Sequence, residues 1–306
     1  MNVPAIPIPP TFIEEIDRHH GAAGHTWLET LPATVRRVTT EWALTIDGPA
    51  RHGARGIVVP VSRESMAHAL KLTMPDDVTT AEIIGLQSWN GHGTVTLVAV
   101  DVHAAALLLE RLDANRNLAA LPIEEAICEA GRLIRRLSVP SQTSHRFPST
   151  SDRAREIIAS VPDTWARTGR PFPEARLRQI CTLANTLVSS TAVGLTTWDF
   201  HAENVLWGER AGWTMIDPMP LIGDPEVALA PFLWNRADEI AGPDHVRRLL
   251  EGYVAAGDLD PVLTRAWLIV RLADYWLWGL GAGLTIDPER CHILLDWLDP
   301  EPSSIE

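Results

Sequence analysis

Three polar residues in the second half of the chain have types and spacing suited to phosphoryl transfer. Asp199 and Asn204 are separated by four residues, the interval that phosphoryl-transfer loops use for a proton-accepting Asp and a metal-binding Asn. Asp217 follows thirteen residues later, at the end of a short apolar run. The pattern predicts Asp199 as the catalytic residue that deprotonates an acceptor hydroxyl, with Asn204 and Asp217 as ligands of Mg²⁺.

A β-hairpin is expected to bring the two metal ligands together. Two β-prone runs, residues 205–207 and 213–216, flank a turn that has glycine at both ends. Because the outer ends of a hairpin are neighbours, Asn204 and Asp217 should converge on one point. Two oxygen ligands beside nucleotide phosphates suit Mg²⁺, since this ion keeps some of its waters and takes few protein ligands.

The only lysine of the chain is a candidate phosphate ligand. Lys71 stands against 25 arginines and closes an apolar run that begins at Met66, so it is expected on a strand that enters a core. A compact ammonium fits between phosphate oxygens in a narrow cleft that a wide guanidinium would not enter. The alternative is that drift from lysine to arginine spared one position, and Lys71 by itself does not decide between the two.

A carboxylate on the next predicted element is expected to hold Lys71 in place. Residues 79–89 have the pattern of a short helix, and Glu82 lies near its start. An ion pair with Glu82 would fix the ammonium and keep it charged. The alternative leaves Glu82 in solvent and sets Asp76 or Asp77 opposite the lysine. We favour Glu82 because the apolar residues that follow it indicate a core-facing side of the helix.

With these motifs the sequence resembles the aminoglycoside/hydroxyurea phosphotransferase family, the streptomycin 6-kinase type within the protein-kinase-like fold. The resemblance covers most of the chain between about residue 25 and about residue 240, and its landmarks occur in the family's order, at residues 27–32, 42–49, 69–71, 107–112 and 216–235. It implies an ATP-dependent kinase that phosphorylates a hydroxyl of a cationic, aminoglycoside-like small molecule and confers antibiotic resistance.

Two positions depart from the family's pattern. Family members commonly carry His-Gly before the catalytic Asp, where this chain has Thr197-Trp198, and many carry an Asp at the position of Ala228. The first change leaves the backbone before Asp199 to be held by a different side chain. The second removes a residue that braces the catalytic loop. Neither change removes a group expected to touch phosphate or metal, so both bear on substrate and turnover more than on reaction type.

The order of predicted elements is α+β and fits two lobes. Strands are expected at residues 35–46, 56–61, 66–72, 94–100 and 105–110, with the helix at 79–89 between the third and the fourth. This is the order of a small antiparallel-sheet lobe, so residues 1–112 are predicted to bind the nucleotide. Residues 113–306 are predicted to be a larger, mainly helical lobe with the catalytic loop and the acceptor site. Its helices are expected at residues 122–137, 173–189, 225–240, 245–255, 261–280 and 288–298.

The junction of the lobes, residues 109–113, is predicted to act as a hinge that binds adenine. Glu110 and Leu112 would offer backbone N–H and C=O groups to the edge of the base, which requires no particular side chains. The sequence contains no Gly-x-x-x-x-Gly-Lys-Ser/Thr motif, so the commonest P-loop route to ATP is excluded.

Composition fits a cytoplasmic enzyme that acts on small molecules. The formal net charge of −13 argues against nucleic acid as a partner. It would attract a cation, but the reading that we favour is that it simply keeps the protein in solution. No apolar stretch reaches the ~20 residues that span a membrane. Residues 1–10 are rich in proline and lack a basic cluster, so a secretory signal is not expected. A monomer or a homodimer is expected.

Two classes of function remain open from the sequence. The first is Mg²⁺-dependent transfer of the γ-phosphate of ATP to a small-molecule hydroxyl. The second is a catalytically impaired, nucleotide-binding sensor or scaffold of the same fold, and a kinase of a different small metabolite is a further alternative. Lys71, Asp199, Asn204 and Asp217 favour the first class, and the departures from the family's pattern leave the second open.

Overall fold

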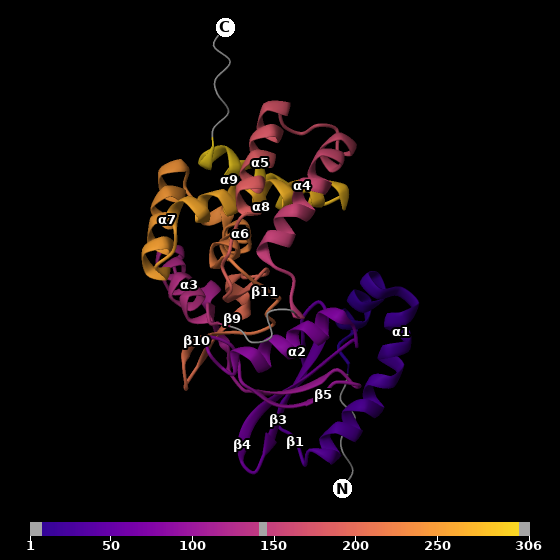
Figure 1. The fold of residues 1–306 in the computed structure, drawn as a ribbon. Helices are drawn as coiled ribbons and strands as arrows, with labels where there is room; N and C mark the ends of the chain where they lie inside the picture. The colour runs from indigo at the N-terminus through magenta and orange to yellow at the C-terminus, as the bar shows by residue number, and fades with distance from the viewer. Residues whose placement is uncertain (1–7, 141–145, 300–306) are drawn as a thin grey trace. The chain divides into compact units, whose positions relative to one another are not determined.

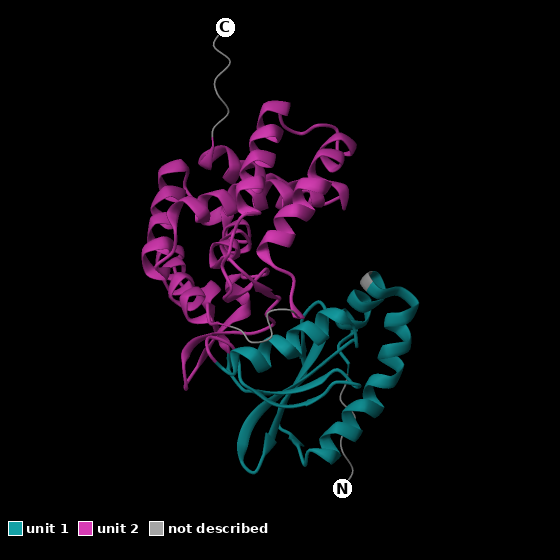
Figure 2. Ribbon diagram, in the orientation of Figure 1, with its two compact units in different colours: residues 1–91, 95–113 teal, residues 92–94, 114–306 magenta. Residues whose placement is uncertain are grey.

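The chain divides into two compact units. The computed structural model describes residues 8–140 and 146–299. Most of residues 1–10, the proline-rich segment in which no secretory signal is expected, lies outside these ranges. Unit 1 comprises Met1–Gly91 and Val95–Asp113, and unit 2 comprises His92–Thr94 and Ala114–Glu306 (Figure 2). None of the helices in the described ranges combines the length and apolarity that crossing a membrane requires.

Unit 1 is built on an antiparallel sheet. Its long strands are neighbours in the order β3 (Gly56–Arg63), β4 (Met66–Thr73), β6 (Ala106–Glu110) and β5 (Leu97–Asp101), while the short β1 (Thr45–Ile46) and β2 (Arg51–His52) both pair with β3. Lys71 in β4 lies between Val58 of β3 and Leu107 of β6. Because side chains alternate along a strand, Lys71 faces away from Leu70 and Leu72.

A long helical segment, α1 (Pro10–Glu41), is kinked at Gly21, lies along the sheet of unit 1 (Figure 1) and corrects one prediction. The strand expected at residues 35–46 is wrong, because the residues up to Glu41 are helical and only Thr45–Ile46 is a strand. β-branched residues suggested a strand, but Leu28, Leu31, Val35 and Val38 recur at helical spacing and pack in one core with the strands.

The opposite face of the sheet carries α2 (Asp77–Trp89), the helix predicted at residues 79–89. Asp76 caps its N-terminus, since its carboxylate accepts a hydrogen bond of 2.8 Å from the Thr79 amide. The buried side of the helix includes Ile83, Leu86 and also Glu82. A carboxylate on the buried side of a helix needs a partner, and the sheet beneath supplies one.

Unit 2 is mainly helical, with α3 (Ile123–Leu137), α4 (Thr150–Arg167), α5 (Glu174–Leu187), α6 (Leu229–Trp234), α7 (Pro243–Gly257), α8 (Pro261–Gly281) and α9 (Ile286–Leu298). The apolar α8 packs against α4, α5, α6 and α9. The helix expected at residues 225–240 is wrong: the segment is broken into η4 (Pro225–Ala228), α6 and η5 (Ala237–Glu239). Its backbone leaves helical geometry at Arg236, where φ is −122°. No prediction was made for α4, whose periodicity is interrupted by Pro162.

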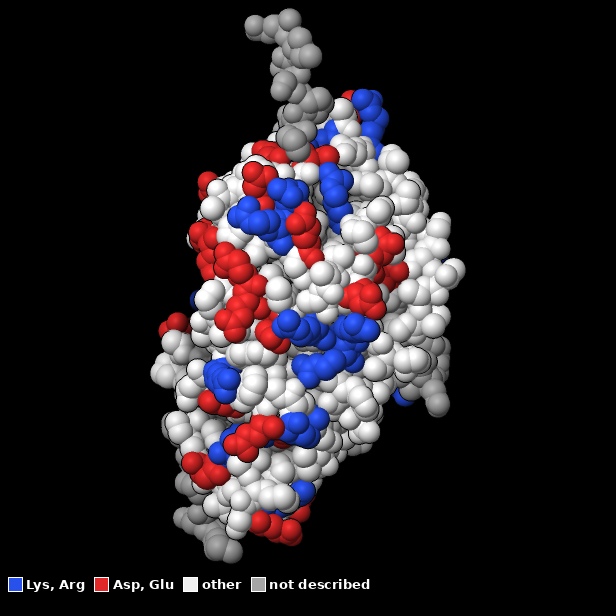
Figure 3. All heavy atoms as spheres, turned by 90° about the vertical axis from the view of Figure 1, so that its left-hand side faces the viewer, with Lys and Arg blue, Asp and Glu red and all other residues white. Residues whose placement is uncertain are grey.

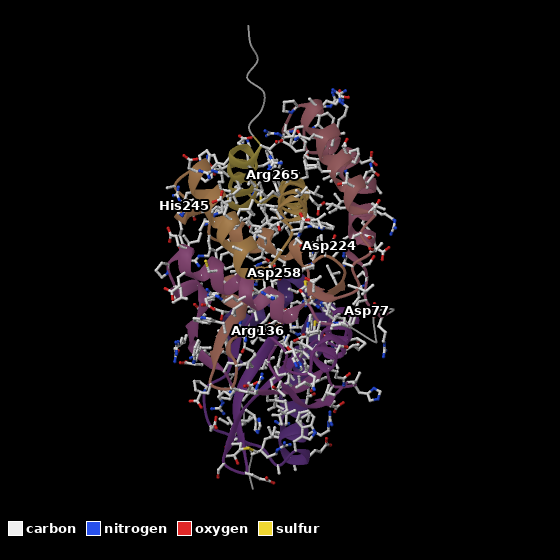
Figure 4. The ribbon with its side chains drawn as sticks, turned by 60° about the vertical axis from the view of Figure 1, so that its left-hand side comes forward. Asp77, Arg136, Asp224, His245, Asp258 and Arg265 are labelled. Carbon is white, nitrogen blue, oxygen red and sulfur yellow. The ribbon has the colours of Figure 1, made fainter. Side chains whose placement is uncertain are left out.

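Two short sheets connect these helices to the polar motif. β10 (Gly212–Met215) pairs with β9 (Val205–Gly208), which also pairs with β7 (Asp113–Asn117), and β8 (Leu195–Thr197) pairs with β11 (Pro220–Ile222). The predicted hairpin is thus confirmed as β9 and β10, with Val205 opposite Met215. Arg136 on α3 donates to the Ala211 carbonyl at 2.8 Å and also to the Trp213 carbonyl, which ties the hairpin to the helix (Figure 4).

Charged side chains of both signs are interspersed on the face drawn in Figure 3. Many are paired along their own helix: Arg247, for example, lies 3.2 Å from both Asp244 and Glu251. Such exposed pairs contribute little to stability, typically below about 1 kcal/mol each. The net negative charge is therefore not gathered into one patch on this face.

Candidate active site

Asp199 lies in the short loop between β8 and β9, two strands that belong to different sheets. Just before it, the Trp198 amide donates to the Met219 carbonyl at 2.8 Å, which continues the pairing of β8 with β11. After it, Phe200 is buried and the single turn η3 (Ala202–Asn204) leads into β9. The Asp199 side chain is 41% exposed, and Nε2 of His201 lies 3.9 Å from its carboxylate. The carboxylate is thus held at a fixed place and open to a substrate.

The backbone brings Asn204 and Asp217 together at the base of the hairpin. The Ile216 amide donates to the Asn204 carbonyl at 2.8 Å, one step beyond the pairing of Val205 with Met215. Within the described residues the side-chain amide of Asn204 makes no hydrogen bond, so its oxygen is open to a ligand. Asp217 has a φ of +50°, a left-handed conformation that Asp and Asn adopt more readily than other residues with a Cβ. The predicted convergence of the two residues is present in the backbone.

The donor set at this hairpin fits Mg²⁺ rather than zinc. Over residues 8–140 and 146–299, no three His, Cys, Asp or Glu side chains cluster in a way that could hold a metal ion by themselves. Mg²⁺ in nucleotide sites does not need such a cluster, because phosphate and water oxygens fill most of its coordination positions. One amide oxygen from Asn204 and one carboxylate from Asp217 match this requirement.

Arg271 on α8 holds the backbone immediately before Asp199. Its Nη1 donates to the carbonyls of Trp198 at 2.7 Å and of Val227 at 3.0 Å, and its guanidinium carbon lies 3.7 Å from the centroid of the Trp198 indole. Burial lowers the pKa of Arg271 to about 10, while the charges of Asp199 and Asp274 oppose the shift, so the side chain stays protonated at neutral pH.

The contact between Arg271 and Trp198 gives a role to the tryptophan that stands where family members commonly have glycine. The indole of Trp198 is one face of the stack with Arg271, so this tryptophan supplies a contact that a glycine would not. Arg271 was not among the residues predicted from the sequence. The available signal was a single arginine inside the apolar run at residues 266–273, since a buried charge requires dedicated partners.

The second departure, at Ala228, is offset by neighbouring polar groups. Asp224 accepts a hydrogen bond of 2.9 Å from the Trp267 indole N–H and a further one from the Ser190 hydroxyl, so its carboxylate joins α8 to the segment before β8 (Figure 4). Ala228 itself is buried, and Arg271 reaches the carbonyl of Val227 beside it. Arg271 thus holds the residue before Asp199 without an Asp at position 228, and Asp224 fixes the helix α8 that carries Arg271.

We expect Arg271→Met to lower kcat by about 10- to 100-fold, because the loop that aims Asp199 loses its brace and small misplacements are costly in transfer reactions. Steady-state kinetics below the unfolding temperature would measure the effect. Arg176→Met is the matched control: Arg176 is also buried in unit 2, but its guanidinium binds Asp296 at 2.6 Å, at another place in the fold. Loss of thermal stability with unchanged kcat in both variants would show that Arg271 is purely structural.

The predicted ion pair of unit 1 is present. Nζ of Lys71 lies 2.7 and 2.8 Å from the two carboxylate oxygens of Glu82, and the two side chains are only 8% and 10% exposed. Asp76 instead pairs with Arg55 and caps α2, and Asp77 is exposed, so the alternative partners are excluded. A buried ion pair is a weak source of stability, since desolvation costs about as much as the pairing returns. The role of Lys71 in phosphate binding stays a prediction.

The two residues predicted to contact adenine, Glu110 and Leu112, differ in the hydrogen bonds that their backbone groups already make. The Glu110 amide donates to the Thr96 carbonyl at 2.9 Å, and the Glu110 carboxylate accepts from the Thr96 hydroxyl at 2.9 Å. The Leu112 N–H and C=O make no hydrogen bond among the residues that the structure describes. Leu112 therefore has the backbone groups that a base edge could use, whereas the amide of Glu110 is already engaged in unit 1.

Comparison with known proteins gives matches over nearly the whole chain. Residues 41–280 match the model of the family described as aminoglycoside/hydroxyurea antibiotic resistance kinase. The chain is 36% identical over 287 residues to streptomycin 6-kinase of Streptomyces griseus, covering 92% of this chain and 93% of the relative. It is also 36% identical over 292 residues to hydroxyurea phosphotransferase of Kitasatospora aureofaciens, covering 93% and 84% respectively.

Solved structures of low identity share the fold. A thermostable mutant of aminoglycoside phosphotransferase APH(4)-Ia, in a ternary complex with ADP and hygromycin B, aligns with a TM-score of 0.59 at 12% identity, over 86% of this chain and 97% of that one. Choline kinase LicA from Streptococcus pneumoniae aligns with a TM-score of 0.56 at 10% identity, over 87% and 99%. The predicted α+β, protein-kinase-like fold is confirmed.

Proposed function

Because the chain belongs to the aminoglycoside/hydroxyurea antibiotic resistance kinase family, we propose that it uses Mg²⁺ and transfers the γ-phosphate of ATP to a hydroxyl of a cationic, aminoglycoside-like acceptor. Membership makes the chain a kinase that phosphorylates a hydroxyl group. The phosphate donor, the metal ion and the cationic acceptor of the streptomycin type are our inference. The single observation that supports it most is the loop that carries an exposed Asp199 and leads, through Asn204, into a hairpin ending at Asp217.

The chemistry assigns one task to each residue. Asp199 accepts the proton of the acceptor hydroxyl as that oxygen bonds to the γ-phosphorus. The bond between the γ-phosphorus and the oxygen that bridges it to the β-phosphate breaks, and ADP leaves. Lys71, fixed by Glu82, binds phosphate oxygens, and the hinge at Leu112 and Glu110 receives the adenine. Asn204 and Asp217 would hold Mg²⁺, which supplies charge neutralisation at the phosphates.

The braces around Asp199 support transfer over the sensor or scaffold alternative. A protein that only binds nucleotide has no need for a substrate-accessible carboxylate whose preceding residue is fixed by two separate contacts. Here a buried arginine and a strand pairing hold the residue before Asp199, while the carboxylate itself stays open to solvent. These contacts around Asp199 are equally compatible with a cationic acceptor and with hydroxyurea, the compound after which one relative is named.

A coupled assay of ADP release tests this function. The chain would be given ATP and Mg²⁺ with streptomycin, hygromycin B, choline or hydroxyurea, and thermal shift with Mg·ATP would report nucleotide binding independently. We expect ADP release that depends on streptomycin or a related cationic aminoglycoside. A thermal shift without release above the acceptor-free rate for any acceptor would support the sensor. Release with hydroxyurea alone would contradict the cationic acceptor.

A further inference from the structure

A pocket of about 700 Å³ lies in unit 2 between the C-terminal halves of α4 and α8. Its α4 wall includes the hydroxyl-bearing Thr164 and Thr168, and its α8 wall includes Asp274, Leu277 and Trp278. Neither Asp199 nor the hairpin lines it. Its size and its mixture of apolar and polar walls are typical of a site for a small organic molecule.

Asp274 puts a carboxylate into this pocket without a compensating contact. Within residues 8–140 and 146–299 its oxygens accept no hydrogen bond and form no ion pair. Burial raises the pKa of Asp274 to about 6, against the opposing charges of Arg271 on its own helix and Arg153 on α4, while Glu156 on α4 reinforces the rise. At neutral pH the group is therefore mostly an anion, and a partly buried anion is stabilised by a cation that enters the pocket.

Aromatic rings line α8 between the pocket and the loop of Asp199. The rings of Trp234 and Tyr275 stack with centroids 4.1 Å apart, and those of Tyr275 and Trp278 with centroids 5.2 Å apart. Trp278 is 55% exposed, although an indole is costly to leave in water. At the other end of the row, Arg271 lies 5.5 Å from the Trp234 ring and stacks on Trp198, the residue before Asp199. The pocket thus shares one row of stacked groups with the catalytic loop.

An indole face beside a carboxylate is a combination that binds organic cations, by cation–π attraction and by ion pairing. We propose that this pocket binds the cationic part of the acceptor, a guanidinium or an ammonium group, with Asp274 as its counter-ion and Trp278 as its stacking face. This assignment rests on the proposed function and adds the place where the acceptor's charge is recognised. A neutral acceptor such as hydroxyurea gains nothing from the Asp274 charge, so the pocket selects for a cationic acceptor.

Arg167 also lines the pocket and carries the opposite sign. Its guanidinium is exposed and donates to the Thr164 hydroxyl at 3.1 Å. Because solvent screens an exposed charge much more than a buried one, Asp274 has the larger effect on a bound cation. The donors of Arg167 and the threonine hydroxyls suit the hydroxyl groups of a sugar ring.

Calorimetric titration of the full chain with streptomycin, without ATP, tests the pocket apart from catalysis. We expect Asp274→Asn to weaken streptomycin binding about 10- to 100-fold, as for loss of a desolvated ion pair. Asp163→Asn, an exposed carboxylate on α4 outside the pocket lining, should change it less than about twofold. Thermal shift with Mg·ATP, unchanged in both variants, would show that each is folded. In kinetics the acceptor KM should rise in Asp274→Asn while kcat changes little.

Streptomycin affinity should also fall between about pH 7.5 and about pH 5 in the wild type, because protonation of Asp274 removes the counter-ion, and the fall should be smaller in Asp274→Asn. Equal affinity in wild type and Asp274→Asn would overturn the assignment, as would failure of the wild type to bind any of streptomycin, hygromycin B and choline. Binding that depends on Asp274 without ADP release would support the pocket and contradict the kinase proposal, so the two can fail separately.

Discussion

Replacing Asp199 with alanine is expected to lower kcat by at least about 10³-fold, as for loss of a general base, while ATP affinity changes by only a few-fold. The carboxylate is open to solvent, with Nε2 of His201 3.9 Å away, and is assigned to the acceptor hydroxyl rather than to the nucleotide. Calorimetric titration with Mg·ATP and the coupled assay would measure the two quantities on one preparation. Transfer that persists in Asp199→Ala would remove this residue from the mechanism.

Asp217 should behave in the opposite way and serves as the comparison. As the proposed metal ligand it would contribute to Mg·ATP binding itself, so its loss should weaken nucleotide affinity as well as turnover. Asp217→Asn is the sharper variant, because asparagine tolerates the φ of +50° at this position, whereas alanine would add backbone strain to the loss of a ligand. Undiminished affinity for Mg·ATP in Asp217→Asn would overturn the metal assignment.

Lys71→Arg is expected to be nearly as damaging as Lys71→Met. The ammonium lies within hydrogen-bond distance of both Glu82 oxygens in a buried site, and a guanidinium is wider and cannot occupy the same point. A loss of about 2–4 kcal/mol in transition-state stabilisation is expected for such a charge-assisted contact. This corresponds to roughly 30- to 900-fold in kcat/KM. Steady-state kinetics of both variants with one accepted acceptor would measure it.

Arg55→Lys is the matched control for the lysine. Arg55 also pairs with a carboxylate of unit 1, Asp76, but at an exposed position, and the exchange of one cation for the other should leave kcat/KM unchanged. Wild-type kcat/KM in Lys71→Arg would show that a cation of any shape suffices at this position. The case for phosphoryl transfer would then rest on the segment from Asp199 to Asp217 alone.

Local patterns in the sequence were sufficient where the determining contacts are close along the chain. The hairpin of β9 and β10 follows from two β-prone runs around a short turn, and it places Asn204 beside Ile216. The pair of Lys71 and Glu82 spans eleven residues and follows from a strand with an adjacent amphipathic helix. For the same reason most strands of unit 1 and most helices of unit 2 lie where the periodicity predicts them.

Local propensity failed where packing decides the conformation. Residues 35–41 contain β-branched side chains and yet are helical, because Val35 and Val38 complete an apolar stripe of α1 that the sheet of unit 1 buries. The segment at residues 225–240 has an apolar composition suited to one helix, but its chain must turn at Arg236, whose guanidinium binds Glu239 and the Leu121 carbonyl. Neither conformation can be predicted from the residues that are adjacent in the sequence.

The sequence by itself determined which residues are the candidates for the reacting groups, and only the tertiary structure decided what surrounds them. Spacing identified Asp199, Asn204 and Asp217, because a loop and a hairpin are local structures. The brace from Arg271 to Trp198 joins residues 73 positions apart, and the pocket between α4 and α8 joins Thr164 to Asp274. Side chains so distant in sequence meet only because α8 packs against several other helices at once. The periodicity of the sequence does not indicate which face of α8 contacts which of these helices.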